Sequence, residues 1–173
     1  MPLTKIQSLG ITDGTIVNAD INASAAIAGT KISGSFGKVL QVITATDTTE
    51  RSTLSTSFVT GSNTLSVSIT PSSASNKIFV IVNSVILADT RAYYTIFRGA
   101  TNLGDATYGL SEQYPGDGSN YILTNLSMSI LDSPSTTSAT TYEVRFKDSD
   151  GSGTSYLNYR GIKASITCFE IAG

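Results

Sequence analysis

Apolar residues recur at every second position in several segments of this chain. Residues 64–69 read Thr-Leu-Ser-Val-Ser-Ile, and residues 142–147 read Tyr-Glu-Val-Arg-Phe-Lys. Successive side chains of a β-strand point to opposite faces, so a period of two gathers the apolar side chains on one face. Such half-buried strands are typical of antiparallel sheets. No window of twelve residues has the pattern of an amphipathic helix, and the sequence therefore predicts an all-β fold.

Further runs of the same kind complete the predicted sheets. With residues 77–87 they give about nine strands, the others being expected at 38–43, 55–59, 91–97, 121–131, 156–159 and 162–171. Clusters of Gly, Pro, Asn, Asp and Ser, the residues that favour turns, separate these runs. We expect an antiparallel β-sandwich of jelly-roll type over residues 37–173.

Residues 77–87 differ from the other predicted strands because they are apolar on both faces. A strand with two apolar faces is buried on both, and in an antiparallel sandwich this indicates that one face meets a neighbouring subunit. We therefore expect part of a subunit interface at Phe79, Val80 and Ile81.

Residues 1–36 follow a different pattern, in which isoleucines recur at spacings near five. This spacing fits neither a strand nor a helix. One apolar residue in five gives no closed core to offset a backbone entropy of about 1–2 kcal/mol per residue. The regularity favours burial between chains, with each isoleucine forming a layer with its symmetry mates around one axis. The interface candidates are Ile11, Ile16, Ile21, Ile27 and Ile32. A flexible linker, or an arm that orders only on its target, is the alternative.

The composition argues against nucleic-acid binding and against a structural zinc site. The chain has a net charge of −2, no His and one Cys, and 14% of its residues are charged, against ~25% in ordinary domains. Clustered Lys and Arg are missing, which argues against nucleic acid as a partner. Without His, the commonest general base and metal ligand is missing, and one Cys builds no structural zinc site. Cys168 lies in an alternating segment and is expected to be a buried thiol.

We expect no membrane insertion and synthesis in a host cytoplasm. The longest apolar stretch, residues 78–87, is too short to span a bilayer, and the N-terminus lacks the apolar core of a secretory signal.

Catalysis and metal binding find little support in the sequence. No pair of carboxylates is singled out for glycan hydrolysis, and the serines lack a His partner. Residues 148–153, Asp-Ser-Asp-Gly-Ser-Gly, resemble a calcium loop, but the Glu of an EF-hand is replaced by Tyr159. We interpret this loop as a hairpin turn and expect neither an enzyme nor a cofactor.

Residues 101–120 are the best candidate for a recognition loop. Tyr, Ser, Gly and Asn dominate adaptable binding surfaces, because Tyr gives contact area at low entropic cost and amides offer hydrogen bonds. The candidate receptor contacts are Asn102, Asp105, Tyr108, Glu112, Gln113, Tyr114, Asp117 and Asn120. The alternative is that residues 104–110 form another strand and that Tyr108 packs in the core.

Several segments resemble virion proteins of tailed bacteriophages, especially those that infect marine bacteria and cyanobacteria. Residues 11–32, which begin Ile-Thr-Asp-Gly-Thr-Ile-Val-Asn-Ala-Asp-Ile, are similar to segments of tail fibres. Gly-Lys-Val-Leu-Gln-Val-Ile at 37–43, Ser-Val-Ser-Ile-Thr-Pro-Ser-Ser-Ala-Ser-Asn-Lys-Ile at 66–78, Tyr-Thr-Ile-Phe-Arg-Gly at 94–99 and Ser-Ile-Thr-Cys-Phe-Glu-Ile at 165–171 are similar to fibre head domains. The resemblance covers nearly the whole chain. It carries no set of functional residues.

This resemblance implies a homotrimeric virion protein with a jelly-roll head like those of the TNF and C1q proteins. Residues 1–36 would be a short shaft or arm that joins other virion proteins, and residues 37–173 the head, which would contact a host surface glycan or protein. We therefore expect a short tail fibre or fibre-tip subunit. A capsid decoration or head-borne knob docked through residues 1–36 is the alternative, and a secreted carbohydrate-binding module is a third reading.

Overall fold

The computed structural model of the chain describes residues 38–60, 65–116 and 120–173. The isoleucines of residues 1–36 and Asp117 lie outside the described residues. The predictions made for them, and the division into an arm and a head at residues 36 and 37, remain predictions.

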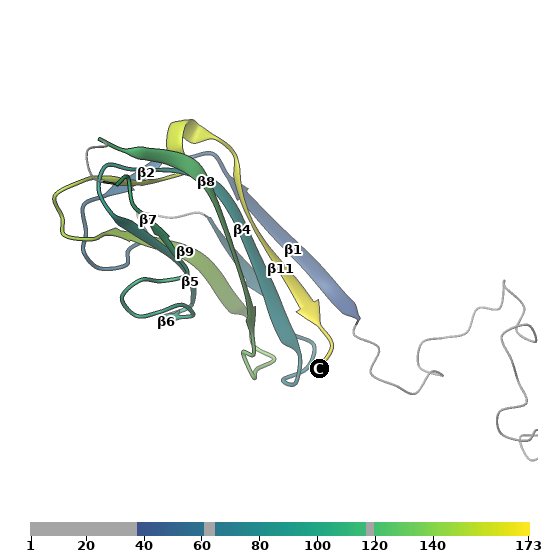
Figure 1. Cartoon of the computed structure of the whole chain (residues 1–173). Helices are drawn as coiled ribbons and strands as arrows, with labels where there is room; N and C mark the ends of the chain where they lie inside the picture. Colours follow the sequence, from purple (N-terminus) through teal and green to yellow (C-terminus); the bar gives the residue numbers. More distant parts are fainter. Residues whose placement is uncertain (1–37, 61–64, 117–119) are drawn as a thin grey trace, which may run out of the picture. The chain divides into compact units, whose positions relative to one another are not determined.

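Two antiparallel sheets pack face to face, which confirms the predicted β-sandwich (Figure 1). Sheet A contains β1 (Val39–Asp47), β2 (Arg51–Thr53), β4 (Lys77–Ala88), β8 (Ile122–Asp132), β10 (Ser155–Leu157) and β11 (Ala164–Ile171). Sheet B contains β3 (Ser66–Ile69), β5 (Ala92–Arg98), β6 (Thr101–Asn102), β7 (Ser111–Gln113) and β9 (Thr140–Asp148). A single 3₁₀ turn, η4 (Tyr159–Gly161), is described between β10 and β11.

The strand order is that of a jelly roll. Sheet A runs β1-β11-β4-β8 and sheet B runs β3-β9-β5-β7. The chain therefore crosses from one sheet to the other between β2 and β3, β3 and β4, β4 and β5, β7 and β8, β8 and β9, and β9 and β10. The longest strand, β4, pairs with β8 along one side and with β11 and β10 in turn along the other. It is the central strand of sheet A.

The core lies between the sheets and is built from the alternating positions that the sequence predicts. Ile78, Val80 and Val82 of β4 point inward and are fully buried, and the rings of Tyr94 and Phe146 stack at 5.9 Å. Cys168 is also buried, which confirms the sequence prediction; burial raises the pKa of its thiol to about 12.

Two short segments differ from their predicted strands. Residues 55–59 form no regular strand and make only an isolated β-bridge, between Val59 and Phe146. They are also hydrogen-bonded to the end of β9, where the Asp148 N–H donates to the Ser55 carbonyl (2.8 Å). The predicted strand at 156–159 ends at Leu157, because Asn158 takes a left-handed conformation (φ 56°) and starts η4.

The two ends of the sandwich are distinct. Lys38 and Ala172 lie together at one end, where the Ala172 N–H donates to the Lys38 carbonyl (3.0 Å), and η4 lies at the other (Figure 1). We name the first the proximal end and the second the distal end. The chain therefore passes from residues 1–37 into the sandwich at the proximal end.

A buried carboxylate fastens the proximal end. Glu170 is 1% exposed and accepts hydrogen bonds from Gln41, Ser72 and Asn76, which join β1, β11 and the β3–β4 connection. Burial alone would raise its pKa, but the bonds from Asn76, Gln41 and Ser72 outweigh burial and lower the pKa to about 2.

Candidate functional site

The middle of the outer face of sheet A carries no charge from β1 to β8, although Lys77 at the start of β4 points outward beside it. Three rows of neighbouring residues cross these four strands: Val42, Phe169, Phe79 and Leu131; Thr44, Thr167, Ile81 and Ser129; Thr46, Ser165, Asn83 and Ser127. None of these side chains is charged, and we call this surface the uncharged face. Its apolar row is the one nearest the proximal end, and Val42 and Leu131 in it are both 53% exposed.

Two of the three interface candidates of β4 lie on this face. Phe79 and Ile81 point outward and are half-buried, and the Phe79 ring lies 6.3 Å from that of Phe169. Val80 points the other way and is fully buried in the core. The prediction for Val80 is wrong, because alternation puts it on the opposite face from its two neighbours.

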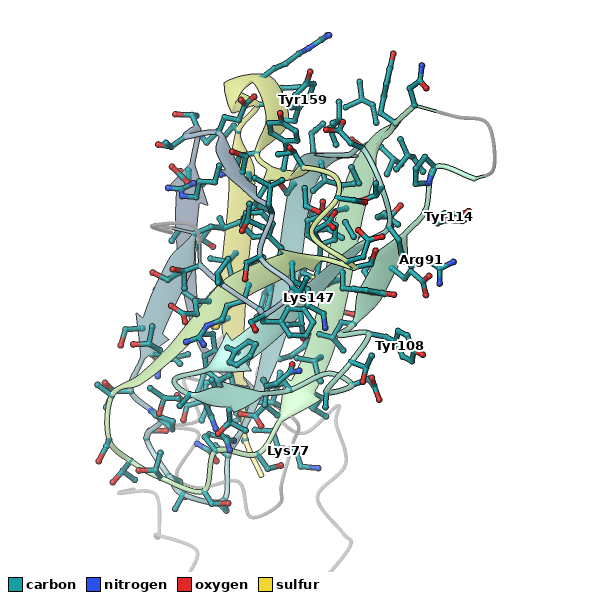
Figure 2. All side chains as sticks on the ribbon, turned by 90° about the vertical axis from the view of Figure 1, so that its left-hand side faces the viewer. Lys77, Arg91, Tyr108, Tyr114, Lys147 and Tyr159 are labelled. Carbon is teal, nitrogen blue, oxygen red and sulfur yellow. The ribbon has the colours of Figure 1, made fainter. Side chains whose placement is uncertain are left out.

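The outer face of sheet B is charged. Glu143, Arg145 and Lys147 of β9 alternate outward, as the sequence predicts, and Arg145 bonds Glu143 at 2.6 Å. The cations lie over aromatic rings, with Arg145 4.1 Å from the centre of Phe97 and Lys147 4.7 Å from that of Phe58. Figure 2 shows Lys147 in the middle of this face. Cation–π contacts of this kind cover apolar surface while leaving charge in water.

The predicted recognition residues 102–108 are used largely within their own turn. Asn102 accepts a hydrogen bond from Thr95 (2.7 Å) and donates one to the Asp105 carbonyl (2.9 Å). The Asp105 carboxylate accepts the N–H groups of Tyr108 and Thr107, which lower its pKa. These bonds shape a tight loop at the edge of sheet B, where Asp105 also bridges to Gly109.

Tyr108 is exposed, so its alternative placement in the core is wrong. Its ring packs edge-on against Tyr93, which is nearly buried, while the neighbouring Tyr94 lies in the core. Of these two adjacent tyrosines, neither is freely exposed.

The remaining candidates in this stretch, Glu112, Gln113 and Tyr114, lie on β7 and directly after it. Glu112 forms an ion pair with Arg91 (3.1 Å), and Arg91 in turn lies 4.6 Å from the centre of the Tyr114 ring. Gln113 donates a hydrogen bond to Ser111. Arg91, Tyr114 and Tyr108 lie along one edge of the view in Figure 2. The candidates from Asn102 to Tyr114 thus share one edge of sheet B.

A pocket of about 300 Å³ opens at the distal end. Segments far apart in the sequence line it: Leu87 and Asp89 from the end of β4, Tyr121 and Leu123 from the start of β8, and Tyr156, Tyr159 and Arg160 from β10 and η4. Tyr156 and Tyr159 pack edge to face at 5.4 Å, and the Arg160 guanidinium lies 5.4 Å from the centre of the Tyr159 ring. We call this the distal pocket.

A buried polar network sets the position of η4 in this pocket. The Asn158 side chain accepts a hydrogen bond from Ser84 of β4 (2.9 Å) and donates one to Asp47 at the end of β1 (2.9 Å). Asp47 also pairs with Arg51, and all four residues are buried. Because buried polar groups cost stability unless they are paired, this network fixes the geometry of the turn.

The backbone of the turn takes conformations that side chains rarely adopt. Asn158, Arg160 and Gly161 have φ values of 56°, 60° and 66°. A Cβ atom on Gly161 would lie 2.9 Å from the Thr48 carbonyl oxygen, so glycine is required there. The Arg160 N–H donates to the Glu50 carboxylate (2.6 Å) and ties the turn to the β1–β2 connection. Residues held in this region of conformational space cluster at binding sites.

The sequence missed most of this pocket. Asn120, one of the predicted receptor contacts, precedes Tyr121 in the chain and is exposed, while the others described lie on sheet B. Tyr156 and Tyr159 were assigned to a strand. The signal that could have found the turn is Asn-Tyr-Arg-Gly at 158–161, since Asn and Gly are the residues that tolerate positive φ.

The loop that resembles a calcium site is the turn between β9 and β10. The Asp148 carboxylate accepts hydrogen bonds from the N–H groups of Asp150 and Gly151. The Asp150 carboxylate accepts hydrogen bonds from both the N–H group and the hydroxyl group of Ser152. Across residues 38–60, 65–116 and 120–173, no cluster of three or more potential ligands gathers to hold a metal ion. No helix in the described part of the chain is long and apolar enough to cross a membrane.

Comparison with known proteins adds no relative. No protein-family model matches the sequence, and no curated protein matches it either.

Proposed function

We propose that this chain is a structural protein of a tailed bacteriophage virion, a short trimeric tail fibre or fibre-tip subunit that acts in host attachment by binding and not by catalysis. Residues 1–36 join it to other virion proteins, and the β-sandwich is the head. Beyond the sequence resemblance, the observation that carries this proposal is the polarity of the sandwich, by which we mean that the chain enters at the proximal end and the pocket lies at the distal end.

That polarity follows from the fold. β1 starts at the proximal end and β4 runs from the same end to the distal pocket, so the chain leaves residues 1–37 at one end and presents a pocket at the other. An attachment protein needs this separation, because the end that is mounted on a particle is not accessible to a host surface.

The uncharged face supports the trimer. The buried centre of an interface is depleted of charge and enriched in aromatic residues, and the uncharged face has no charged side chain in its three rows and two phenylalanines in the apolar one. Of the three rows, the apolar one lies nearest to the proximal end, where residue 38 enters the sandwich. The occupant of this face in our proposal is a second copy of the chain.

Capsid decoration is the second candidate, since the same polarity would suit a knob that is docked through residues 1–36 on a shell. Copy number separates the two roles. A tail fibre is present in a few to some tens of copies per particle, whereas a decoration protein scales with the capsid lattice.

Two measurements test the proposal. Light scattering on the purified full chain should give three times the chain mass of 18.1 kDa. Quantitative mass spectrometry of purified virions, with antibody labelling in the electron microscope, should give low copy number and label at the tail. A monomer would remove the trimer, hundreds of copies on the capsid would assign decoration, and absence from virions would overturn the virion role.

A further inference from the structure

We propose that the distal pocket binds a neutral pyranose sugar. The proposal deepens the attachment function and relies on it only for where the sugar is met, at a host surface. The pocket itself is argued from its side chains.

The tyrosines supply the surface that a sugar ring needs. A pyranose has a face of C–H groups, and the electron-rich face of an aromatic ring attracts such groups while excluding water. Tyr121 is 58% exposed at the rim, and Tyr156 and Tyr159 form a fixed edge-to-face pair beside it. Leu87 and Leu123 add apolar surface to the lining.

The polar side chains supply the hydrogen bonds that select a sugar over a purely apolar ligand. The Asp89 carboxylate has two acceptor oxygens, which suit two neighbouring hydroxyl groups, and the Arg160 guanidinium offers donors to hydroxyl oxygens. One carboxylate and one guanidinium leave the lining without net charge, so neither an acidic nor a basic sugar gains from charge attraction overall. The combination therefore points to a neutral one.

Size and rigidity agree with this ligand. About 300 Å³ is at the low end of small-ligand pockets, so the site fits one sugar ring better than a long oligosaccharide. The network of Asp47, Ser84 and Asn158 holds η4 in place before any ligand arrives. A preformed site loses less entropy on binding.

Ligand-observed saturation-transfer NMR on the purified full chain tests the proposal. The probes are the methyl pyranosides of glucose, galactose and mannose, with galacturonic acid as the charged comparison. We expect at least one neutral pyranoside to receive saturation, strongest at its C–H face, with a Kd on the order of 1 mM, as befits a single small ligand.

Two variants assign the signal to the pocket. Tyr121→Ala should weaken binding about tenfold and, because this side chain is exposed, leave the melting temperature nearly unchanged. Asp89→Asn keeps an acceptor for the Thr154 N–H but removes the charge, and should weaken binding severalfold. Tyr108→Ala is the matched variant, since Tyr108 is 53% exposed and lies on sheet B away from Tyr159 (Figure 2).

The outcomes separate cleanly. Loss with Tyr121→Ala and retention with Tyr108→Ala supports the distal pocket, and the reverse moves recognition to sheet B and overturns the proposal. Saturation of none of the neutral pyranosides, or preference for galacturonic acid, also overturns it. Sugar binding by a chain that virions lack would sink the attachment function and leave the pocket assignment standing.

Discussion

The outer faces of the two sheets differ in charge. On sheet B, three successive outward rows include a charged side chain of β9, such as Arg145 beside Thr95 or Lys147 beside Tyr93, and the cations cover aromatic rings. On sheet A, three successive rows carry no charge, and two aromatic rings, Phe79 and Phe169, lie in the apolar one. The inner faces of both sheets contribute to one hydrophobic core.

The difference shows that alternation determines the core but not the use of the outer face. Charged outer positions keep sheet B soluble and disfavour sheet-to-sheet contact. An outer face without charge leaves sheet A free to pack against a like surface. The comparison therefore predicts that sheet A and not sheet B mediates assembly, and the following predictions test it in order of expected effect.

The largest effect belongs to the inward side of sheet A. Val80→Asp places an unpaired carboxylate in the core and should destabilise the fold by more than about 4 kcal/mol, because Val80 is fully buried. Circular dichroism and urea denaturation would detect the loss. A folded, stable Val80→Asp variant would contradict the placement of β4.

One residue away, the same charge should have a different result. Phe79→Asp puts a carboxylate on the uncharged face and should dissociate the proposed trimer into chains of 18.1 kDa while the sandwich stays folded. Lys147→Asp on sheet B is the matched variant and should keep the assembly. Light scattering with circular dichroism measures both properties, and equal behaviour of the two variants would remove the contrast between the faces.

Sheet A should also give the molecule its acid sensitivity. Glu170 has a pKa of about 2, below its ordinary value of 4.5, so its contribution is complete above pH 4.5 and is lost as the pH falls toward 2. Glu170→Gln replaces one carboxylate oxygen with an NH2 group, which then faces either the Gln41 donor or the donors of Ser72 and Asn76. The substitution should lower the free energy of unfolding at pH 7 by on the order of 2 kcal/mol. It should also make this free energy fall less steeply as the pH is lowered.

Urea denaturation at pH 7, 4.5 and 2.5 checks this prediction. If the decline between pH 4.5 and 2.5 were as steep in Glu170→Gln as in the natural chain, the acid sensitivity would have another source.

The smallest effect is expected at the edge of sheet B. Glu112→Gln removes the ion pair with Arg91, whose side chains are 40% and 41% exposed, so water and salt already screen it. Neither the urea midpoint nor the mass in solution should change measurably. A clear loss of stability would show that the Arg91, Glu112 and Tyr114 cluster is a rigid part of the sheet.

The sequence predictions succeed for strands with one apolar face and fail in part for β4, which is apolar on both faces. Regular alternation locates the inward residues of β3 and β9 and most of the long strands within two positions, because period two and burial are directly linked. β1 is the exception, since it continues to Asp47, beyond the predicted end at residue 43. Alternation fails for Val80, since a strand that is apolar on both faces does not reveal which face is the core. The neighbouring sheets decide that question.

The distal pocket could not be predicted from any single stretch. Its tyrosines come from the residue before β8, from β10 and from η4, and they meet only because β4 pairs with both β8 and β10 at its distal end. Residues 101–120 have the composition of a recognition loop, yet the polar groups of Asn102 and Asp105 are hydrogen-bonded within the turn itself. Composition indicates what side chains can bind but not whether they are already bonded.

The path of β1 has a mechanical consequence. A head that is held through residue 38 and grips its ligand at the distal end carries any pull lengthwise along its strands. The β1–β11 ladder pairs Val39 with Ile171 at one end and Asp47 with Ala164 at the other. Its hydrogen bonds lie across the direction of the pull, so they share the force and must yield together in shear. Such a ladder resists tension far better than one that opens bond by bond.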